Sequence, residues 1–294
     1  MVDLRLLRYF VATVDAGTIT QAAADLYVAQ PSLSRQIRRL EQSLGFALFD
    51  RTKSRISLTA AGQAFLPVAQ DLISRAAQAE GVARGLATGL TPKLTVATAS
   101  TTSTDIIAPF IVNQGQPVAI GNVIESSPET VYSIVRRGRA DLAIGTRLPP
   151  SQLRHAVIGT VYLWAQCIPS HPVAEHRSID LIELANHQLF VMPEESAVRR
   201  TFDNAIATKG LSYHVEAETH SSRVAQALAA TGSGVCITSD DARYGLSEVR
   251  IHSNGHPLEV NLYAAWDPTH YAADRVENLA NEIGGFIELR YPRD

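Results

Sequence analysis

Residues 30–44 read QPSLSRQIRRLEQSL, and this stretch decides the fold of the N-terminal end of the chain. Its aliphatic residues recur at the three- and four-residue steps of an α-helix: Leu33, Ile37, Leu40 and Leu44. Pro31 suits the first helical turn, where its missing N–H leaves no hydrogen bond unmade. The opposite face is polar and carries Ser34, Arg35, Arg38 and Gln42. The stretch therefore predicts a helix with one buried face and one basic, polar face.

Two further helices are predicted upstream of this stretch. Apolar residues between Leu4 and Val14 recur at helical spacing, and Gly17 ends that first helix. The next four residues, TITQ, fit a capping box in which the Thr18 hydroxyl caps a second helix and the Gln21 side chain reaches back to the Thr18 N–H. A short helix at 22–26 and a turn at 27–29 follow. This order of elements describes a helix-turn-helix.

The polar face of the third helix is suited to reading DNA. In a helix-turn-helix, the N-terminal residues of this helix face the base edges in the major groove, where Gln, Ser and Arg side chains can hydrogen-bond. Downstream, two short apolar stretches around a basic tip predict a β-hairpin wing that contacts phosphates or the minor groove. The candidate DNA-binding residues are Thr18, Gln30, Pro31, Ser32, Ser34, Arg35, Arg38, Arg51, Lys53 and Arg55.

The net charge of −3 hides an asymmetry along the chain. Residues 1–90 carry 10 basic and 7 acidic side chains, whereas residues 91–294 carry 16 and 22. A basic N-terminal end on an otherwise acidic chain favours nucleic-acid binding. On charge alone, a solvated helix face would explain the same pattern.

A long helix is predicted after the hairpin. Thr59 is placed to cap it, and apolar residues then recur at alternating steps of four and three residues, which is a heptad seam. The seam is interpreted as a dimerisation surface, and the alternative is one edge of a single globular core. Gly85, Gly89 and the Thr91-Pro92 pair are expected to end the helix. The seam residues are Phe65, Ala69, Leu72, Ala76, Ala79, Ala83 and Leu86.

In the remaining two thirds of the chain, strand patterns alternate with helical patterns. The predicted strands are 94–99, 118–124, 142–144, 162–168, 189–192, 235–238 and 260–266. The predicted helices are 106–112, 130–137, 198–209, 221–230 and 272–289. Alternation of this kind indicates an α/β fold with mostly parallel sheets.

The first ninety residues resemble a LysR-type transcriptional regulator. One departure is Ala29, where the family usually has Ser, so the third helix lacks a side-chain N-cap worth ~1 kcal/mol. The matching motifs, in order, are Leu7-x-Tyr9-Phe10, GTITQAA at 17–23, QPSLSRQI at 30–37, Leu40-Glu41, Leu44-Gly45, LFDR at 48–51 and Leu58-Thr59-x-Ala61-Gly62.

The resemblance implies three parts of the chain. These are an α+β winged helix-turn-helix DNA-binding domain over residues 1–58, a long linker and dimerisation helix with a hinge over 59–91, and an α/β effector-binding domain over 92–294. The last would be bilobal and similar to periplasmic binding proteins of type II. Its subdomain I would comprise 92–165 and 267–294, and its subdomain II 166–266. The partners implied are promoter DNA, a small effector and further copies of the chain in a homodimer and homotetramer.

The effector is expected beyond the carboxyl ends of the strands. Five hydroxyl residues, STTST at 100–104, follow the first strand and precede a helix whose N–H groups favour an anion. A Ser/Thr-rich cap and turn is the alternative. Glu194 and Glu195 add negative charge that Arg199 or Arg200 would have to balance. The candidate effector-binding residues, for a small polar or anionic organic molecule, are Ser100, Thr101, Thr102, Ser126, Ser127, Thr146, Glu194 and Ser196.

Other classes of protein are disfavoured. No uninterrupted apolar run exceeds five residues, the N-terminus lacks a secretory signal, and two cysteines cannot form a disulfide framework, so a soluble cytoplasmic protein is expected. His252 and His256 have a metal spacing, but the Ser-Asn-Gly between them predicts a turn. No nucleophile–base pair or phosphate-binding loop is found, so no enzymatic activity, metal or cofactor is expected. A solute-binding protein or an enzyme on the same bilobal scaffold remain the alternatives.

Overall fold

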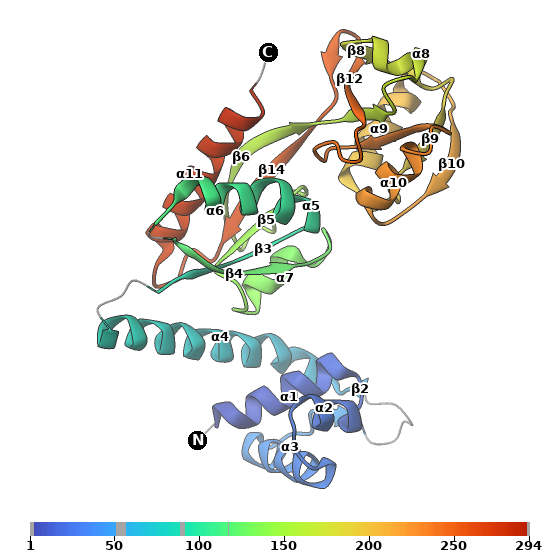
Figure 1. Ribbon diagram of the computed structural model, residues 1–294. Coiled ribbons are helices and arrows are strands. Elements are labelled where there is room, and N and C mark those ends of the chain that lie inside the picture. Colours follow the sequence, from blue (N-terminus) through green and yellow to red (C-terminus); the bar gives the residue numbers. More distant parts are fainter. Residues whose placement is uncertain (1–2, 51–56, 89–91, 117, 293–294) are drawn as a thin grey trace. The chain divides into compact units, whose positions relative to one another are not determined.

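The computed structural model describes residues 3–50, 57–88, 92–116 and 118–292. Two compact units make up the chain: the first comprises Met1–Pro92 with Arg136–Arg139, and the second comprises Lys93–Val135 and Ala140–Asp294. Figure 1 colours the helices and strands of both units along the sequence, from blue to red. The boundary falls at Pro92, which the sequence marks as a helix breaker.

The first unit begins with a helix-turn-helix. Helices α1 (Leu4–Ala16) and α3 (Gln30–Leu44) lie where the sequence predicts them, and α2 (Ile19–Asp25) begins three residues before the predicted range of 22–26, directly after its cap. Gly17 ends α1 in the left-handed conformation, at φ 70°, and Thr18 Oγ1 caps α2 by accepting from the Gln21 N–H at 3.1 Å. The prediction that the Gln21 side chain reaches back to the Thr18 N–H is wrong. The Gln21 side chain donates to Asp25 at 2.8 Å, because a carboxylate one turn ahead accepts a stronger, charge-assisted bond.

One hydrophobic core holds these helices and the hairpin together. The buried Glu41 ties the end of α3 to the first hairpin strand, since its Oε1 accepts from the Leu48 N–H at 2.9 Å and the Phe49 N–H at 3.3 Å. Strands β1 (Phe49–Asp50) and β2 (Ser57–Leu58) pair antiparallel, as the predicted wing requires. Fully buried core residues of this unit include Leu7, Phe10, Leu33, Leu40 and Leu48. The predicted tip residues Arg51, Lys53 and Arg55 lie outside the described residues.

The long helix α4 (Ala60–Thr88) starts at the predicted cap. Thr59 Oγ1 accepts from the Gly62 N–H at 2.9 Å. Gly62 is needed here because a Cβ at this position would collide with the Leu48 carbonyl. Gly85 does not end the helix as predicted, since the helix continues to Thr88 and a single glycine costs only about 1 kcal/mol. Gly89 and Thr91 lie outside the described residues.

The second unit contains two sheets. The first has the order β4-β3-β5-β14-β6, with β3 (Leu94–Thr98) parallel to β4 (Ile120–Glu125) and β5 (Leu142–Gly145). Strand β14 (Glu259–Trp266) runs antiparallel to β5 and to β6 (Arg154–Tyr162). Inward-facing residues such as Val96, Leu142 and Ile144 pack on one face against the segment 100–114 and on α11 (Ala273–Arg290). Helix α7 (Val131–Arg136) packs on the other face, against Ala97, Ala143 and Ala265.

The second sheet has the order β10-β9-β11-β7-β12-β13, and β8 (Ser178–Asp180) pairs with β12. Its other strands are β7 (Trp164–Cys167), β9 (Gln188–Val191), β10 (His214–Glu218), β11 (Val235–Thr238), β12 (Ser247–Ser253) and β13 (His256–Pro257). Helices η2 (Pro172–Glu175), α8 (Leu181–Leu184), α9 (Ala197–Thr208) and α10 (Ser222–Ala229) complete this subdomain. Figure 1 shows α9 and α10 together with this sheet. Both sheets are mixed rather than mostly parallel.

The boundaries between the two subdomains differ from those predicted. Strand β14 belongs to the first sheet, so the second subdomain ends before Glu259 and not at 266. The chain first passes between the sheets at the buried Leu163, between β6 and β7, rather than at 165. The apolar runs of the sequence continue across the connections between the two sheets. The hydropathy of the sequence therefore does not show where one sheet ends and the other begins. His252 lies in β12 and His256 in β13, and the turn between these strands is the one that the Ser-Asn-Gly between the two histidines predicted.

Candidate functional site

The exposed face of α3 is the first candidate site. Leu33, Ile37 and Leu40 are buried, so the helix can present only its other side to a ligand. Ser34 is half-buried, and its Oγ accepts from Gln30 Nε2 at 3.4 Å. Neither Arg35 nor Arg38 forms an ion pair within the described part of the chain. The exposed predicted residues of this helix are Gln30, Pro31, Ser32, Arg35 and Arg38. Both guanidinium groups are therefore free to bind phosphates or base edges.

Two residues around this face were not among the sequence candidates. Tyr27 is 96% exposed in the turn before α3, with a left-handed φ of 54°. Arg39 is exposed beside Arg38. An exposed tyrosine hydroxyl is a common phosphate ligand. The sequence signal for Tyr27 was only its place in the turn. The predicted Thr18 is exposed too, although its hydroxyl already caps α2.

The second candidate site is a pair of adjoining cavities between the two subdomains of the second unit. One wall is the helical segment formed by α5 (Ser100–Thr102), the π-helical turn η1 (Ser103–Ile107) and α6 (Ala108–Gln114). π-Turns of this kind are frequent at functional sites. The opposite wall comes from the loops that follow β9 and β11 in the second subdomain. Residues shared by both cavities are Ala99, Thr101, Pro128 and Ser196.

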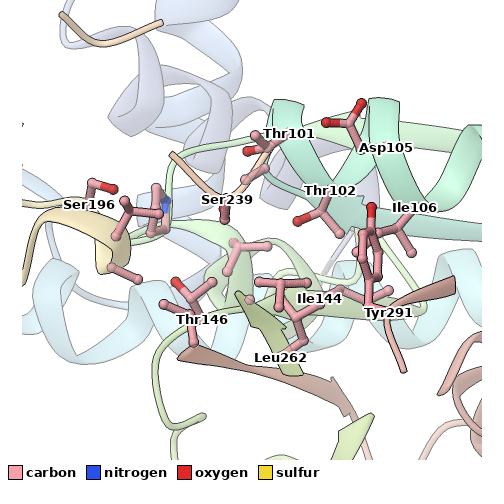
Figure 2. A pocket seen from close by; sticks show the side chains of 18 residues that line it. Thr101, Thr102, Asp105, Ile106, Ile144, Thr146, Ser196, Ser239, Leu262 and Tyr291 are labelled. Carbon is pink, nitrogen blue, oxygen red and sulfur yellow. The ribbon is translucent and has the colours of Figure 1, made fainter. Parts of the chain in front are cut away.

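The inner cavity has a volume of about 90 Å³. Figure 2 shows Thr101, Thr102 and Asp105 on the helical segment, and Ile144 and Leu262 on the strands across the cavity. Most of the wall is aliphatic. Thr146 Oγ1 is buried there and has no hydrogen-bond partner among the described residues. A buried hydroxyl normally has such a partner, so Thr146 Oγ1 can donate to or accept from a ligand in the inner cavity.

The outer cavity is larger, about 790 Å³, and more polar. The first subdomain contributes Ser100, Thr104, Ser126 and Ser127 to its wall, and the second contributes residues after β9, β10 and β11. Its charged lining residues are Glu129, Glu195, Arg223, Asp240 and Arg243, with His220 beside them. A site of this composition suits a small polar ligand that needs both hydrogen-bond donors and acceptors.

Several side chains bridge the two subdomains next to these cavities. Asp105 of the first subdomain is 7% exposed and accepts from Arg243 Nη2 of the second at 2.5 Å. The Asp241 N–H also donates to Asp105, at 3.3 Å. Tyr291 donates to the Asp241 carboxylate at 2.8 Å. Across the outer cavity, Arg223 Nη2 donates to Thr104 Oγ1 at 3.0 Å. Of these bridging residues, the sequence singled out only Thr104, as part of the STTST stretch at 100–104.

Asp240 is the most perturbed acid of the outer cavity. Burial raises its pKa to about 6, and the neighbouring Asp105 charge acts in the same direction. Hydrogen bonds from Ser222 and from Thr238, at 2.9 Å, together with the Arg243 charge, oppose that rise. A carboxyl group with such a pKa changes its charge near neutral pH.

Most of the predicted effector residues meet at these cavities. Thr102 and Thr146 line the inner one, Ser100, Ser126 and Ser127 the outer one, and Thr101 and Ser196 both. Glu194 is exposed and lines neither cavity. Its neighbour Glu195 lines the outer one, and Arg200 donates to the Glu195 carbonyl oxygen. Arg199 instead pairs with Asp203 at 2.8 Å and with Glu218 at 3.1 Å, so it does not balance Glu194.

The predicted seam of α4 divides into two parts. Phe65 packs against Phe10 and Phe46, with ring centroids 6.2 and 5.8 Å apart, and Ala69 is fully buried in the same core. These two residues therefore pack in the core of their own unit, as predicted by the alternative that the seam is one edge of a globular core. Leu72, Ala79 and Ala83 are exposed and Ala76 is half-buried. No helix in the described ranges is both long and apolar enough to cross a lipid bilayer.

A helix-turn-helix with a basic exposed helix, joined to a two-lobed module with a polar cavity, defines a DNA-binding regulator with a ligand-binding domain. Comparison with known proteins agrees with this class. The family of bacterial regulatory helix-turn-helix proteins of the LysR type matches residues 4–63, and the LysR substrate binding domain matches residues 87–285. The chain belongs to the LysR family of DNA-binding transcriptional regulators.

Individual relatives are distant. The chain is 28% identical to the nitrogen assimilation regulatory protein nac of Klebsiella aerogenes, over 83% of this chain and 80% of the relative. It is 26% identical to a probable RuBisCO transcriptional regulator of Cyanophora paradoxa, over 99% and 94%. Among solved structures, a full-length OxyR variant from Pseudomonas aeruginosa has a TM-score of 0.67 at 21% identity, covering 98% of this chain and 95% of that one. CbnR has a TM-score of 0.67 at 20% identity, covering 96% and 99%.

Proposed function

We propose that the protein binds promoter DNA through α3 and its wing and that a small polar or anionic organic effector in the cavities between the subdomains modulates this binding. The observation that carries the proposal is the convergence of hydroxyl groups from both subdomains on one site, where Thr146 Oγ1 has no hydrogen-bond partner within the described parts of the chain. A ligand there would contact both subdomains at once. It would therefore bind one arrangement of them more tightly than another, which is what an effector requires.

Similarity to known regulators supports the rest of the proposal. A structure described as full-length CbnR complexed with target DNA covers 98% of this chain with a TM-score of 0.65. All of the curated relatives reported above are transcriptional regulators, which supports a non-enzymatic role. Promoter binding in turn supports a cytoplasmic location. The rim Glu195 and the hydroxyl residues of the outer cavity are proposed to select polar ligands.

DNA binding is tested by Arg35→Ala and Arg38→Ala in a binding titration at fixed salt. Arg35 stands near the start of α3, so its loss should weaken operator binding by about 1–3 kcal/mol and relax preference at one base position. Loss of Arg38, as a phosphate ligand, should weaken all sequences alike and reduce the salt dependence. Arg177→Ala, an exposed arginine of the second unit, is the control. Unchanged affinity and specificity in both α3 variants would refute the assignment.

Effector binding is tested by a thermal-shift screen of small organic molecules, followed by calorimetry on the ligand found. Thr101→Val keeps the side-chain size but removes a hydroxyl that lines both cavities, and should weaken binding by about 1–3 kcal/mol. Ser100→Ala tests the outer cavity alone. The same ligand must also change operator affinity in a gel-shift titration, because the coupling is reciprocal. Full affinity in both variants would move the effector site elsewhere.

Dimerisation is proposed to use the exposed part of the α4 seam, from Leu72 to Ala83, and the family resemblance adds a tetramer. Leu72→Glu would bury a charge in that interface and should separate the subunits. Gln63→Glu, on the opposite face of the same helix, should leave the assembly intact. Light scattering at micromolar concentration is the measurement. A monomeric wild type would contradict the seam.

A further inference from the structure

Arg223 reaches across the mouth of the outer cavity. It lies in the first turn of α10, on the second subdomain, and its Nη2 donates to Thr104 Oγ1 of the first subdomain at 3.0 Å. The side chain is exposed and lines the cavity together with Ser100 and Thr101. A guanidinium at this position faces any ligand that enters between the subdomains.

Two of the other charged groups that line the outer cavity already form ion pairs. Arg243 pairs with Asp105 at 2.5 Å, and Glu129 pairs with Arg147 at 2.9 Å. Asp240 is buried and accepts hydrogen bonds from Ser222 and Thr238. Glu195 lines the same cavity, and within the described residues it forms no ion pair with Arg223. Among the cavity's described cations of fixed charge, Arg223 thus stands out, since its hydrogen-bond partner is a neutral hydroxyl.

We propose that Arg223 makes this site selective for a small organic monocarboxylate, and that it exchanges its bond to Thr104 for an ion pair with the ligand. This inference rests on the proposed function. A charge-assisted bond to a carboxylate is about twice as strong as one to a hydroxyl, and Thr104 can return to solvent. One carboxylate is specified because a second would find no unpaired cation in the described lining.

The inner cavity indicates the rest of the ligand. It adjoins the outer one at Thr101 and Ser196, and its wall is mainly aliphatic. Its volume of about 90 Å³ is well above the ~10–15 Å³ that a single water molecule needs. A short apolar group fits there, while the carboxylate stays at Arg223 and the intervening hydroxyls bond to polar atoms between them.

The test uses matched probes on the full-length protein: butyrate with butyramide, and hexanoate with hexanamide, at constant ionic strength. Affinities are taken from the rise of the unfolding midpoint over a concentration series. In the wild type, each carboxylate should bind about tenfold or more tightly than its amide. Arg223→Gln should abolish that preference and Arg223→Lys should retain part of it. Thr104→Val should retain or increase it, because the competing hydroxyl is gone. Arg177→Gln is the matched control and should behave as the wild type.

A carboxylate preference that survives Arg223→Gln would overturn the inference, and so would equal binding of acids and amides by the wild type. Absence of binding by all four probes would also count against it, because a site selective for small monocarboxylates must accept one of them. The proposed function fails separately. A neutral ligand whose affinity depends on Thr101 but not on Arg223 would leave the effector site standing and reject only the charge selection.

Discussion

The polar face of α3 and the cavities between the two subdomains use the same chemical groups but are built in different ways. On α3, serine and arginine side chains come from neighbouring turns of one helix, and Ser32, Arg35 and Arg38 are exposed. In the cavities, hydroxyl groups and arginines come from loops and helices of both subdomains, and many are half-buried. A DNA-reading face therefore needs one correctly oriented helix, whereas the ligand site needs two subdomains held at a defined separation.

The independence of the two regions is tested most strongly by core truncation. Leu40→Ala, at a fully buried site under α3, should lower the stability of the first unit by about 2–5 kcal/mol. Leu142→Ala is the counterpart in the first sheet of the second unit. Both tryptophans, Trp164 and Trp266, lie in the second unit, so their fluorescence follows only that unit, while far-ultraviolet circular dichroism follows both. A single shared transition in both variants would show that the two regions do not fold independently.

The dependence of the cavities on both subdomains is tested by Asp105→Asn. This change leaves Arg243 without its carboxylate, and loss of one partner from a buried pair costs about 3–5 kcal/mol. We expect a loss of about 2–3 kcal/mol in urea unfolding followed by tryptophan fluorescence, because Arg243 keeps some contact with solvent. Glu277→Gln breaks the exposed pair with Arg154 and should cost below about 1 kcal/mol. Equal effects of the two substitutions would contradict the importance of the bridge.

The cavities contain a buried carboxyl group, that of Asp240, whereas the arginines of the α3 face are exposed. The pH dependence of stability makes this difference measurable. Its pKa is about 6 when folded, against an ordinary value of 3.8, so the folded chain holds this proton more tightly than the unfolded chain. The resulting stabilisation is present at low pH and is lost as the pH rises from about 4 through 6. The free energy of unfolding of Asp240→Asn, relative to that of the wild type, should therefore be higher at pH 7 than at pH 4 by on the order of 2 kcal/mol. Urea unfolding across that range checks this, and parallel pH curves for the two proteins would refute it.

The smallest expected effect tests how much the capping residues before α2 and α3 contribute to the stability of the first unit. Thr18 caps α2 with its hydroxyl, whereas Ala29 before α3 provides no side-chain cap. Thr18→Ala should lower the stability of the first unit by about 1 kcal/mol, and Ala29→Ser should raise it by about 0.5–1 kcal/mol. Circular dichroism melts of the full chain measure both. If Ala29→Ser leaves the melting midpoint unchanged, the start of α3 is held by packing and not by its cap.

The elements with a strong local signal were predicted well. Helices α1 to α3 and the start of α4 follow from aliphatic periodicity, Gly17 and the caps at Thr18 and Thr59. Strands β10 and β12 were missed, because β10 lies at a sheet edge with mostly exposed residues and β12 has only two apolar residues, Val249 and Ile251. Strand β6 was missed for a similar reason, since its first half is exposed.

The residues of the candidate site also divide into those with a local sequence signal and those without one. Hydroxyl residues directly after strands, such as Thr101 and Thr146, could be found because the carboxyl ends of parallel strands meet at one edge. Asp105, Arg223 and Arg243 could not, because each acquires its role only from a partner more than a hundred residues away in the chain.

The sequence by itself determined α3, the caps at Thr18 and Thr59 and the family, since these depend on contacts within a few residues or on motifs in a fixed order. Only the tertiary structure decided that β14 returns to the first sheet, that Phe65 and Ala69 serve their own core, and that Arg223 faces Thr104. The physical reason is the range of the interactions. Helix periodicity and capping act over one or two turns, whereas sheet order and ion pairs between subdomains depend on segments brought together only by folding.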